Sequence, residues 1–399
     1  MGKTYAKIYQ AVFSVGMNFI PWGVPKTIQG PGSIKKLPAW IKENGFKKPL
    51  VVTDKVLNQD LHMLDSLYEA AKAENLDLVV YDGVQPNPTD IAINEGLKLF
   101  KENNCDCFIA FGGGSSMDCA KGIGAVYATK KSPEKLQGLF RVLHKIPRIF
   151  AVPTTSGTGS ETTVAAVITI AETHHKASMN DTALMPRFAV LDPELTVGLP
   201  GKVTSTTGLD ALCHAVESYT NHKYNTKLEN TYSLEATKLI YENLYECYVN
   251  PTNLKARENM QVAAFKAGRS FTRGCVGYVH AIGHTLGGLY GTPHGLAMSV
   301  ILPHVMRQFG PAAEKRLAEL AAYCGMKGEN DHDLATQFIN WLDDVKDKMN
   351  VPRTLDVIKE EDIPQIIAWA QKESNPLYPT PVYWEYADFE KCLASISGK

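Results

Sequence analysis

The amino-acid sequence predicts an α/β domain followed by an all-helical domain. The chain has 399 residues, which is beyond one ordinary core and favours two domains. Strand-like and helix-like segments alternate through the first half, which is typical of a parallel sheet with covering helices. After about residue 198, helix-like segments follow one another with little strand between them. We therefore expect domains over residues 1–198 and 199–399, with the boundary in LPGKV, 199–203.

The predicted sheet comes from short apolar runs in the first half. These runs predict strands at residues 49–53, 76–82, 105–111 and 148–155. Helical spacing predicts helices at 60–75 and 90–103. PNPT at 86–89 predicts a turn, because proline fixes φ and disfavours helix before it. The third strand continues into GGGSSMDCAKGIGAVYA, a glycine loop that runs into a further helix.

The second half shows helical periodicity almost throughout. The predicted helices cover residues 206–221, 228–248, 254–271, 277–289, 311–324, 332–348 and 362–373. The sequence has neither an internal repeat nor a low-complexity segment, so we expect one helical domain here and not a repeat array.

Composition and charge exclude several classes of partner. Hydrophobic residues make up 44% of the chain and charged residues 21%, as in an ordinary globular protein. The formal net charge of −1 offers no basic excess for nucleic acid. No stretch reaches about 18 apolar residues, so we expect no transmembrane helix and no membrane partner. Partners must therefore be identified from individual sites.

The cysteines and the N-terminus favour a cytoplasmic protein. Eight cysteines occur at irregular spacings without a Cys-x-x-Cys pair, which fits free thiols in a reducing compartment. The mildly apolar run from Ala11 to Ile20 is broken by Ser14 and Asn18, and no small-residue cleavage site follows it. We therefore expect residues 1–20 to be a short extra segment and not a secretory signal.

The segment FGGGSSMDCAK, 111–121, joins a predicted strand to a predicted helix through three glycines. Glycine lets backbone N–H groups approach a ligand closely, and the partial positive charge at a helix N-terminus suits a phosphate. The pattern is neither Gly-x-Gly-x-x-Gly nor a P-loop that ends in Gly-Lys-Ser/Thr. It indicates either a phosphate cradle or a tight strand–helix turn.

Two other segments follow predicted strands in the same way. PTTSGTGSETT, 153–163, brings hydroxyls and glycines that suit phosphate or ribose, or that alternatively cap a helix. Asp54, at the end of the first strand, is placed where an acid can bind ribose hydroxyls and repel a 2′-phosphate, which favours NAD over NADP. The alternative for Asp54 is a helix N-cap.

Three of the 11 histidines, His280, His284 and His294, lie in the stretch GYVHAIGHTLGGLYGTPHG. Upstream, Asp210 and His214 are four residues apart and share one face of a predicted buried helix. A buried Asp needs a charge partner or several hydrogen bonds, and a metal would satisfy the acid and the histidines together. One carboxylate with imidazoles suits Fe²⁺ or Zn²⁺ better than Ca²⁺ or Mg²⁺. Spacing nominates His280 and His284 as a pair but leaves open which of the three histidines stays free.

These motifs together resemble the iron-containing (group III) alcohol dehydrogenase family over roughly residues 24–395. Within that family the chain is most similar to the short-chain subgroup of lactaldehyde reductase and propanediol dehydrogenase. The family-like segments occur in order at 30–34, 51–55, 82–89, 111–121, 153–161, 191–196, 208–217, 277–284 and 292–297. The resemblance implies an α/β nucleotide-binding domain and an all-α metal-binding domain, the architecture also found in dehydroquinate synthase. It also implies a homodimer or a larger homo-oligomer.

The resemblance carries specific roles onto the acid and the histidines. It implies that the metal ligands are Asp210, His214, His280 and His294. His284 is then not a ligand and becomes the candidate for proton relay, which replaces the pairing that spacing alone suggested.

The resemblance also implies an NAD(H) site along the two loops and the first strand. The residues expected to contact the cofactor are Asp54, Asn87, Gly112, Gly113, Gly114, Ser115, Asp118, Thr154, Thr155, Thr158 and Lys176. The activity implied is interconversion of a small aldehyde and its primary alcohol, with NADH as hydride donor and Fe²⁺ or Zn²⁺ polarising the carbonyl. We expect aldehyde reduction to be the physiological direction.

The substrate is less narrowly predicted. Phe271 is an expected apolar wall of the substrate pocket, with core packing as its alternative. Arg273 would bind an anionic tail, as in sulfoacetaldehyde, or would pair structurally with an acid or backbone carbonyls. Ala165 and Ala166 stand where lactaldehyde reductases tend to carry bulkier polar residues, which argues against lactaldehyde itself.

Two other enzyme classes compete with the dehydrogenase. A non-redox lyase of dehydroquinate synthase type also uses NAD and a metal, but its metal motifs differ from those of this chain. A metal hydrolase would use a metal-bound hydroxide and would have no need for the glycine loop or Asp54. Net consumption of NADH with an aldehyde separates the dehydrogenase from both.

Overall fold

The computed structural model describes residues 2–172 and 175–398, without the side chains at 175 and 176. The chain forms two compact units, one of them Pro21–Gly198 and the other Leu199–Lys399 together with Met1–Ile20. The division after Gly198 coincides with the expected boundary. The assignment of the first 20 residues to the α/β domain is corrected, because their contacts are with the helical unit.

The α/β unit is built on a six-stranded sheet in the order β1-β9-β6-β4-β2-β3, and all its strand pairings are parallel. In that order the strands are Lys26–Gln29, Phe188–Leu191, Arg148–Pro153, Cys107–Gly112, Pro49–Val52 and Val79–Tyr81. Parallel neighbours need a crossover between them, usually a helix, which is why strand and helix patterns alternate along this part of the sequence. The predicted α/β class is confirmed.

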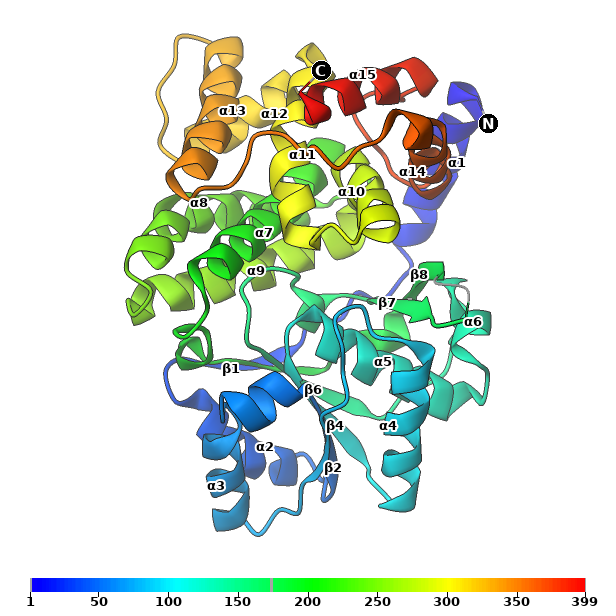
Figure 1. Cartoon of the computed structure of the whole chain (residues 1–399), viewed down its shortest axis with the longest axis vertical. Helices are drawn as coiled ribbons and strands as arrows, with labels where there is room; N and C mark the ends of the chain where they lie inside the picture. The colour runs from blue at the N-terminus through cyan, green and yellow to red at the C-terminus, as the bar shows by residue number, and fades with distance from the viewer. Residues whose placement is uncertain (1, 173–174, 399) are drawn as a thin grey trace. The chain divides into compact units, whose positions relative to one another are not determined.

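Side chains of β4 alternate between the two faces of this sheet. Phe108 and Ala110 belong to an apolar cluster with α4 and α5. Ile109 and Phe111 belong to a second cluster with α2 and α3. Figure 1 shows these two pairs of helices on opposite sides of the sheet. The helices are α2 Leu37–Glu43, α3 Asp65–Ala73, α4 Asp90–Glu102 and α5 Gly114–Thr129.

A smaller sheet in the same unit has the order β5-β8-β7, with β7 and β8 antiparallel. Its strands are Gly138–Leu139, His175–Asn180 and Ala165–Ile170. The sequence analysis did not predict these strands, nor β1 and β9. Short helices complete the unit: η1 Ser33–Lys36, η2 Val56–Asp60, α6 Pro133–Leu136, η3 Ser160–Thr162, η4 Thr182–Leu184 and η5 Pro193–Thr196.

The second unit contains helices and no strand among its described residues, as predicted, and is built around one large apolar core. Its helices are α1 Lys3–Met17, α7 Gly201–Asn221, α8 Lys227–Val249, α9 Leu254–Gly274, α10 Tyr278–Tyr290, α11 His294–Phe309, α12 Pro311–Tyr323, α13 Asp331–Lys348, η6 Glu360–Asp362, α14 Ile363–Ser374 and α15 Tyr386–Ser397. The prediction lacked α1, α11 and α15. In α11 an internal proline, Pro303, weakens the helical signal.

No helix among the described residues has the length and apolar character needed to cross a bilayer.

Candidate metal centre and cofactor loops

Helices α7, α10 and α11 bring an acid and three histidines together. Asp210 and His214 lie one turn apart on α7, and both are almost completely buried. His280 lies in the first turn of α10, and His294 is the first residue of α11. The Oδ1 atom of Asp210 is 4.0 Å from Nε2 of His214, 3.8 Å from Nε2 of His280 and 3.3 Å from Nε2 of His294.

Several polar atoms of this group have no hydrogen-bond partner among the described residues. They are Oδ1 of Asp210, Nδ1 of His214 and Nε2 of His280. A buried polar atom without a partner costs stability, and a cation among these atoms would remove that cost. One ligand atom from each of Asp210, His280 and His294 lies within 4.8 Å of the others, whereas His214 falls outside this tighter set. The donor types, one carboxylate and neutral imidazoles, fit Fe²⁺ or Zn²⁺.

Burial sets the protonation states that a metal site requires. It lowers the pKa of His214 to about 3 and holds the pKa of His280 well below its ordinary value. Burial alone would raise the pKa of Asp210, but the nearby imidazoles of His214 and His294 outweigh it and hold that pKa below its usual range. At neutral pH Asp210 is therefore a carboxylate and the rings of His214 and His280 are neutral, the forms that bind metal.

Glu217 supports the group from behind and was missed by the sequence analysis. Its Oε2 is 2.5 Å from Nδ1 of His280, and its Oε1 accepts a hydrogen bond from the backbone N–H of Val279 at 2.7 Å. A carboxylate on one ring nitrogen fixes the orientation in which the other nitrogen faces the metal. Glu217 lies two helical turns after Asp210, and that spacing was a usable signal.

His284 lies beside the group but makes a different contact. Its Nδ1 is 2.8 Å from Oε1 of Glu373, and the hydroxyl of Tyr378 donates to the same oxygen at 3.0 Å. The ring of His284 stacks near that of His294 with 5.3 Å between centroids. Neither Glu373 nor Tyr378 was found from the sequence, because they lie in QKESNPLY, which matches no catalytic pattern.

Phe271, the expected apolar wall, lies against one member of the metal group. Its ring stacks on that of His214, with centroids 4.1 Å apart and the planes at 14°. This contact gives the metal group an apolar side formed by α9.

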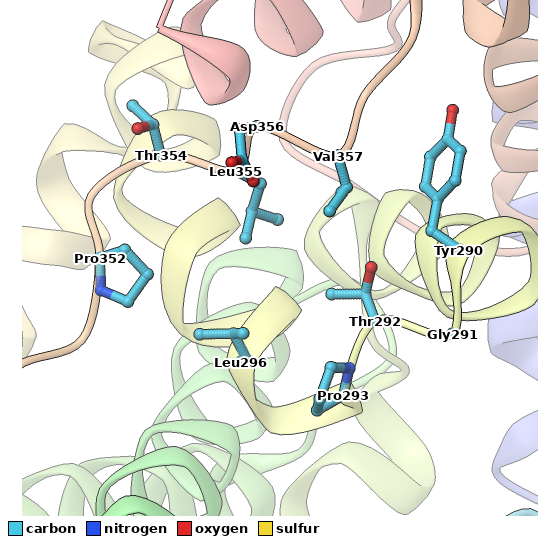
Figure 2. Close-up of a pocket in the computed structure, with 10 residues that line it drawn as sticks. All are labelled: Tyr290, Gly291, Thr292, Pro293, Leu296, Pro352, Thr354, Leu355, Asp356 and Val357. Carbon is cyan, nitrogen blue, oxygen red and sulfur yellow. The ribbon is translucent and has the colours of Figure 1, made fainter.

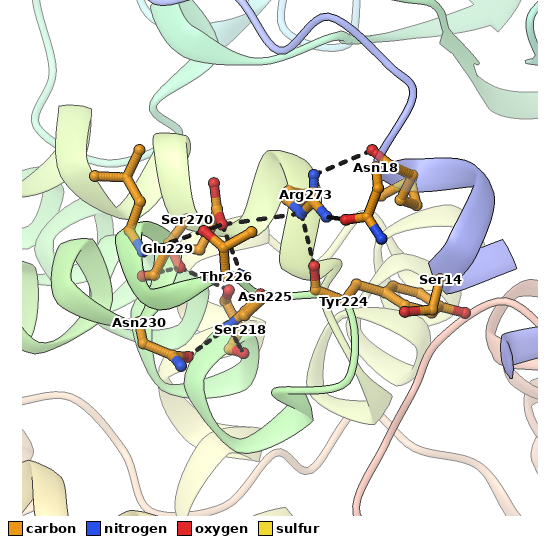
Figure 3. Close-up of polar contacts among 12 residues, drawn as sticks. Ser14, Asn18, Ser218, Tyr224, Asn225, Thr226, Glu229, Asn230, Ser270 and Arg273 are labelled. Carbon is orange, nitrogen blue, oxygen red and sulfur yellow. Dashed lines mark hydrogen bonds and ion pairs between the residues drawn. The ribbon is translucent and has the colours of Figure 1, made fainter.

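Arg273, for which a substrate contact or a structural role was expected, is buried in contacts with its own chain. It is 6% exposed, and its Nε donates to the carbonyl of Tyr224 at 2.7 Å. Its two terminal nitrogens donate to the carbonyl of Met17 at 3.1 Å and to Oδ1 of Asn18 at 2.5 Å. Figure 3 shows the guanidinium directed at the N-terminal segment and at the turn after α7. The structural alternative for Arg273 therefore describes its position.

The segment that leads to His294 also lines a cavity of about 470 Å³ in the helical unit (Figure 2). The lining residues are Tyr290, Gly291, Thr292, Pro293, Leu296, Pro352, Thr354, Leu355, Asp356 and Val357. None of them is an expected metal ligand, although Pro293 directly precedes His294.

In the α/β unit, the glycine loop has no room for a side chain at Gly112 or Gly114. Gly112 has φ +143°, and a Cβ there would lie 2.4 Å from Oγ of Ser116. A Cβ on Gly114, the first residue of α5, would lie 2.9 Å from Cγ2 of Thr158. Gly113 precedes the helix in extended conformation, and Ser115 is partly buried in the first turn. The loop thus presents bare backbone at a helix N-terminus, as a phosphate cradle requires.

The hydroxyl-rich loop after β6 packs against this cradle. The backbone N–H of Thr154 donates to the carbonyl of Gly112 at 3.0 Å. Thr155 is partly buried, and the nearest atoms to a Cβ on Gly113 would be in its side chain, at 3.5 Å. Oγ1 of Thr158 accepts from the backbone N–H of Ser160 at 3.3 Å. The predicted cofactor residues of both loops therefore lie together at the carboxyl ends of β4 and β6.

Lys121 holds this arrangement and was not assigned a role from the sequence. Its buried ammonium donates to the carbonyls of Ser160 and Ala165, at 2.8 and 2.7 Å, and to Oγ1 of Thr163 at 2.9 Å. Asp118 also fixes this loop. Its Oδ1 accepts a hydrogen bond from Oγ of Ser160, and its Oδ2 accepts one from the backbone N–H of Val167, each at 3.0 Å. These contacts make Asp118 a support of the loop.

Three expected cofactor residues, Asp54, Asn87 and Lys176, lie outside the two loops. Oδ1 of Asp54 accepts from the backbone N–H of Leu57 at 3.0 Å, which is the N-cap contact considered as its alternative. Asn87 is exposed, with φ +59°. The side chain of Lys176 lies outside the described residues.

The family model for iron-containing alcohol dehydrogenases matches residues 25–193. The model for the C-terminal part of the same family matches residues 204–396. The chain belongs to the iron-containing alcohol dehydrogenase family. This confirms the family that the motifs resembled, and with it an enzyme of the alcohol dehydrogenase type.

Individual members of the family are similar to this chain over most of their length. The 1,3-propanediol dehydrogenase of Citrobacter freundii is 37% identical over 351 residues, 87% of this chain and 90% of that protein. The crystal structure of a 1,3-propanediol oxidoreductase has a TM-score of 0.90 at 33% identity and covers 95% of this chain and 100% of that one. The sulfoacetaldehyde reductase of Bifidobacterium kashiwanohense, in complex with NAD⁺, has a TM-score of 0.84 at 26% identity, with 95% and 99% covered. The two-domain fold of the family is thereby confirmed.

Proposed function

We propose that the protein is an NAD(H)- and iron-dependent alcohol dehydrogenase that interconverts a small aldehyde and its primary alcohol. One observation carries the proposal: a buried Asp210 oxygen without a hydrogen bond faces three imidazole nitrogens, in a member of this family. A structural group of this kind, left without a cation, has no evident benefit for stability.

Four residues would hold the metal: Asp210, His214, His280 and His294. Bound Fe²⁺, or Zn²⁺ in its place, supplies Lewis acidity toward an alcohol or aldehyde oxygen. Glu217 orients the ring of His280 through Nδ1, and Phe271 shields one face of His214 from water. These contacts keep the ligands in one arrangement before any ion binds.

The nucleotide would lie on the two loops of the α/β unit, with NAD(H) as the hydride carrier. Gly112, Gly113, Gly114 and Ser115 would bind its phosphates, with Thr154, Thr155 and Thr158 along it. The support is the absence of room for side chains at Gly112 and Gly114 and the helix N-terminus that follows. Asp54 would favour NAD over NADP, since its carboxylate would repel a 2′-phosphate.

His284 would move the proton of the substrate hydroxyl. When Nδ1–H donates to Glu373, Nε2 carries the lone pair and is the atom that accepts a proton during alcohol oxidation. In the reverse direction protonated His284 returns that proton at Nε2. The partly exposed ring has a route to solvent that the buried ligand His280 lacks.

We propose aldehyde reduction as the main direction and a small neutral aldehyde as the substrate. Arg273 was the reason to consider an anionic substrate such as sulfoacetaldehyde. Because Arg273 is buried in contacts with its own chain, it no longer supports that alternative. The sulfoacetaldehyde reductase among the similar structures keeps that aldehyde in the assay.

The test is NADH consumption by enzyme reloaded with Fe²⁺ under anaerobic conditions. Small neutral, hydroxylated and anionic aldehydes are compared, with NADPH as a parallel donor. Turnover with a neutral aldehyde, strongest with NADH and lost in Asp210→Asn, supports the proposal. If NADH binds but no aldehyde consumes it, a non-redox lyase replaces the dehydrogenase. If NADH does not bind at all, a metal hydrolase does.

We also propose that the protein is a homodimer in the cytoplasm. Helix α1 carries exposed apolar side chains at alternating spacings of three and four residues, which is typical of a helix–helix seam: Tyr5, Ile8, Val12 and Val15, followed by Phe19. All eight cysteines are free thiols, which fits a reducing compartment.

Light scattering on a sizing column tests the dimer. A dimer that dissociates in Val12→Asp/Val15→Asp, but not in Ile91→Asp on exposed α4, supports the seam. A monomeric wild-type protein would refute it. Fractionation of cells that express the protein tests the cytoplasmic location.

A further inference from the structure

Helix α1 lies outside both regions that match the family, yet one of its faces is fixed in the helical unit. Ala6, Gln10 and Met17 are its buried residues. A buried amide such as that of Gln10, 9% exposed, costs stability unless its donors and acceptor are satisfied. The partners of Gln10 therefore show what this face of the helix does.

Gln10 and Tyr224 donate hydrogen bonds to three consecutive backbone carbonyls after α14. Nε2 of Gln10 donates to the carbonyl of Pro376 at 3.1 Å and to that of Tyr378 at 2.9 Å. The carbonyl between them, that of Leu377, accepts from the hydroxyl of Tyr224 at 2.8 Å. The ring of Phe13, on α1, contacts the ring of Tyr224 with 5.4 Å between centroids. The segment 376–378 is thus held by α1 and by a residue that α1 contacts.

This segment carries Tyr378, whose side chain reaches the catalytic histidine through an acid. Its hydroxyl donates to Oε1 of Glu373 at 3.0 Å, and the same oxygen is 2.8 Å from Nδ1 of His284. A continuous set of contacts therefore runs from Gln10 through Tyr378 and Glu373 to His284.

The far end of α1 is fixed by Arg273. The guanidinium binds the carbonyl of Met17 and the side chain of Asn18, and through Nε it also binds the carbonyl of Tyr224 (Figure 3). Arg273 thus ties the end of α1 to the residue that holds Leu377. Both ends of the buried face of α1 are anchored.

We propose that α1 positions the active site: through Gln10 and Tyr378 it fixes the carboxylate of Glu373, which keeps His284 in one ring orientation with Nε2 free for the substrate proton. Glu373, Tyr378 and Gln10 are positioning residues in this account. The inference rests on the proposed role of His284. An imidazole whose Nδ1 partner moves exchanges tautomers and rotates, so the nitrogen that faces the substrate changes.

The test uses the full-length enzyme loaded with iron and the variants Gln10→Ala, Tyr378→Phe and Glu373→Gln. Each is expected to lower kcat about tenfold, the scale of losing the partner that orients a histidine, with KM and iron content within twofold of wild type. Ser14→Ala is the matched control, because its hydroxyl lies on the same helix but contacts the carbonyl of Lys223 instead. Its kcat should stay within twofold.

A double-mutant cycle with His284→Ala separates positioning from general stabilisation. If α1 acts through His284, Gln10→Ala lowers kcat no further once His284 is absent. An equal loss in both backgrounds would overturn the inference while leaving the role of His284 intact. Unimpaired turnover in His284→Ala would instead overturn the proton-transfer role in the proposed function.

A second readout does not depend on turnover. In Zn²⁺-loaded protein with ¹⁵N-labelled histidine, the His284 resonances, assigned with His284→Ala, should show a single Nδ1–H tautomer. Tyr378→Phe, which removes only a hydroxyl, should give a mixture, whereas Ser14→Ala should not. An unchanged tautomer in Tyr378→Phe would refute the inference even if Gln10→Ala failed to fold.

Discussion

Arg273→Ala should destabilise the helical unit and leave substrate preference unchanged. The guanidinium donates hydrogen bonds to the carbonyls of Tyr224 and Met17 and to Oδ1 of Asn18. Asn18 is exposed and regains water, whereas Tyr224 and Met17 are buried, so two carbonyls lose their donor in a place that solvent does not reach. Glu229, 3.9 Å from Nε and 4% exposed, also loses this cation.

The magnitude follows from counting these losses. Two buried carbonyls without donors cost about 1 kcal/mol each, and the weakened ion pair adds about as much, so the free energy of unfolding should fall by about 3 kcal/mol. Arg273→Lys keeps a charge near Glu229 but not the fork geometry, and should lose about 2 kcal/mol. Arg353→Ala, which breaks an exposed pair with Asp347, is the control and should change little.

Urea unfolding of the three variants measures the free energies. Limited proteolysis should cut Arg273→Ala faster within residues 17–24, because the end of α1 is released. Turnover with neutral and anionic aldehydes should fall by the same factor. Unchanged stability together with a selective loss of the anionic aldehyde would refute the reasoning and return Arg273 to the substrate pocket.

Three further predictions concern metal binding, NADH binding and the pH dependence of stability. Asp210→Asn should weaken iron binding at least 100-fold, and Glu217→Gln about 10-fold, measured by metal analysis after dialysis; full iron content in Asp210→Asn would remove it from the ligand set. Gly114→Ala should raise the Kd for NADH about tenfold in a fluorescence titration, because the added Cβ would lie 2.9 Å from Thr158. Gly198→Ala, whose Cβ meets no atom within 4 Å, is the control and should leave the Kd unchanged. The metal-free protein should lose stability as pH falls from about 6.5 toward 3, because His214, with its pKa lowered to about 3 by burial, stays neutral when folded but binds a proton when unfolded. Urea unfolding across that range checks the sign, and a flat profile that matches His214→Gln would contradict it.

The sequence predicted the architecture well where local pattern and tertiary contact agree. The strands at Cys107–Gly112 and Arg148–Pro153 are continuous apolar runs, because both faces of a parallel strand are buried. The edge strand β1, KTIQ, has no such run and was missed. Helix α11 was missed because Pro303 argues against a helix, although packing in the core retains it.

The candidate site divides in the same way. Asp210, His214 and the later histidines could be predicted, because their spacing on helices is itself the signal. Glu373 and Tyr378 could not, since they come near His284 only through the fold and lie 89 and 94 positions away in sequence. Arg273 was ambiguous because an arginine that binds an anion and one that binds carbonyls look alike in a sequence. Only the position of Met17 and Asn18 decides between them.

The helical unit is discontinuous along the chain, and this has a consequence for biosynthesis. Helix α1 leaves the ribosome before the α/β unit, whereas Tyr224, Arg273 and the 376–378 segment follow only after that whole unit. At 5–20 residues per second, Gln10 waits roughly 20–70 s for the carbonyl of Tyr378 to be synthesised. During that time both apolar faces of α1 are open to water and to chaperones. The α/β unit is synthesised in full before the partners of α1, so α1 stays exposed to capture or proteolysis throughout that interval.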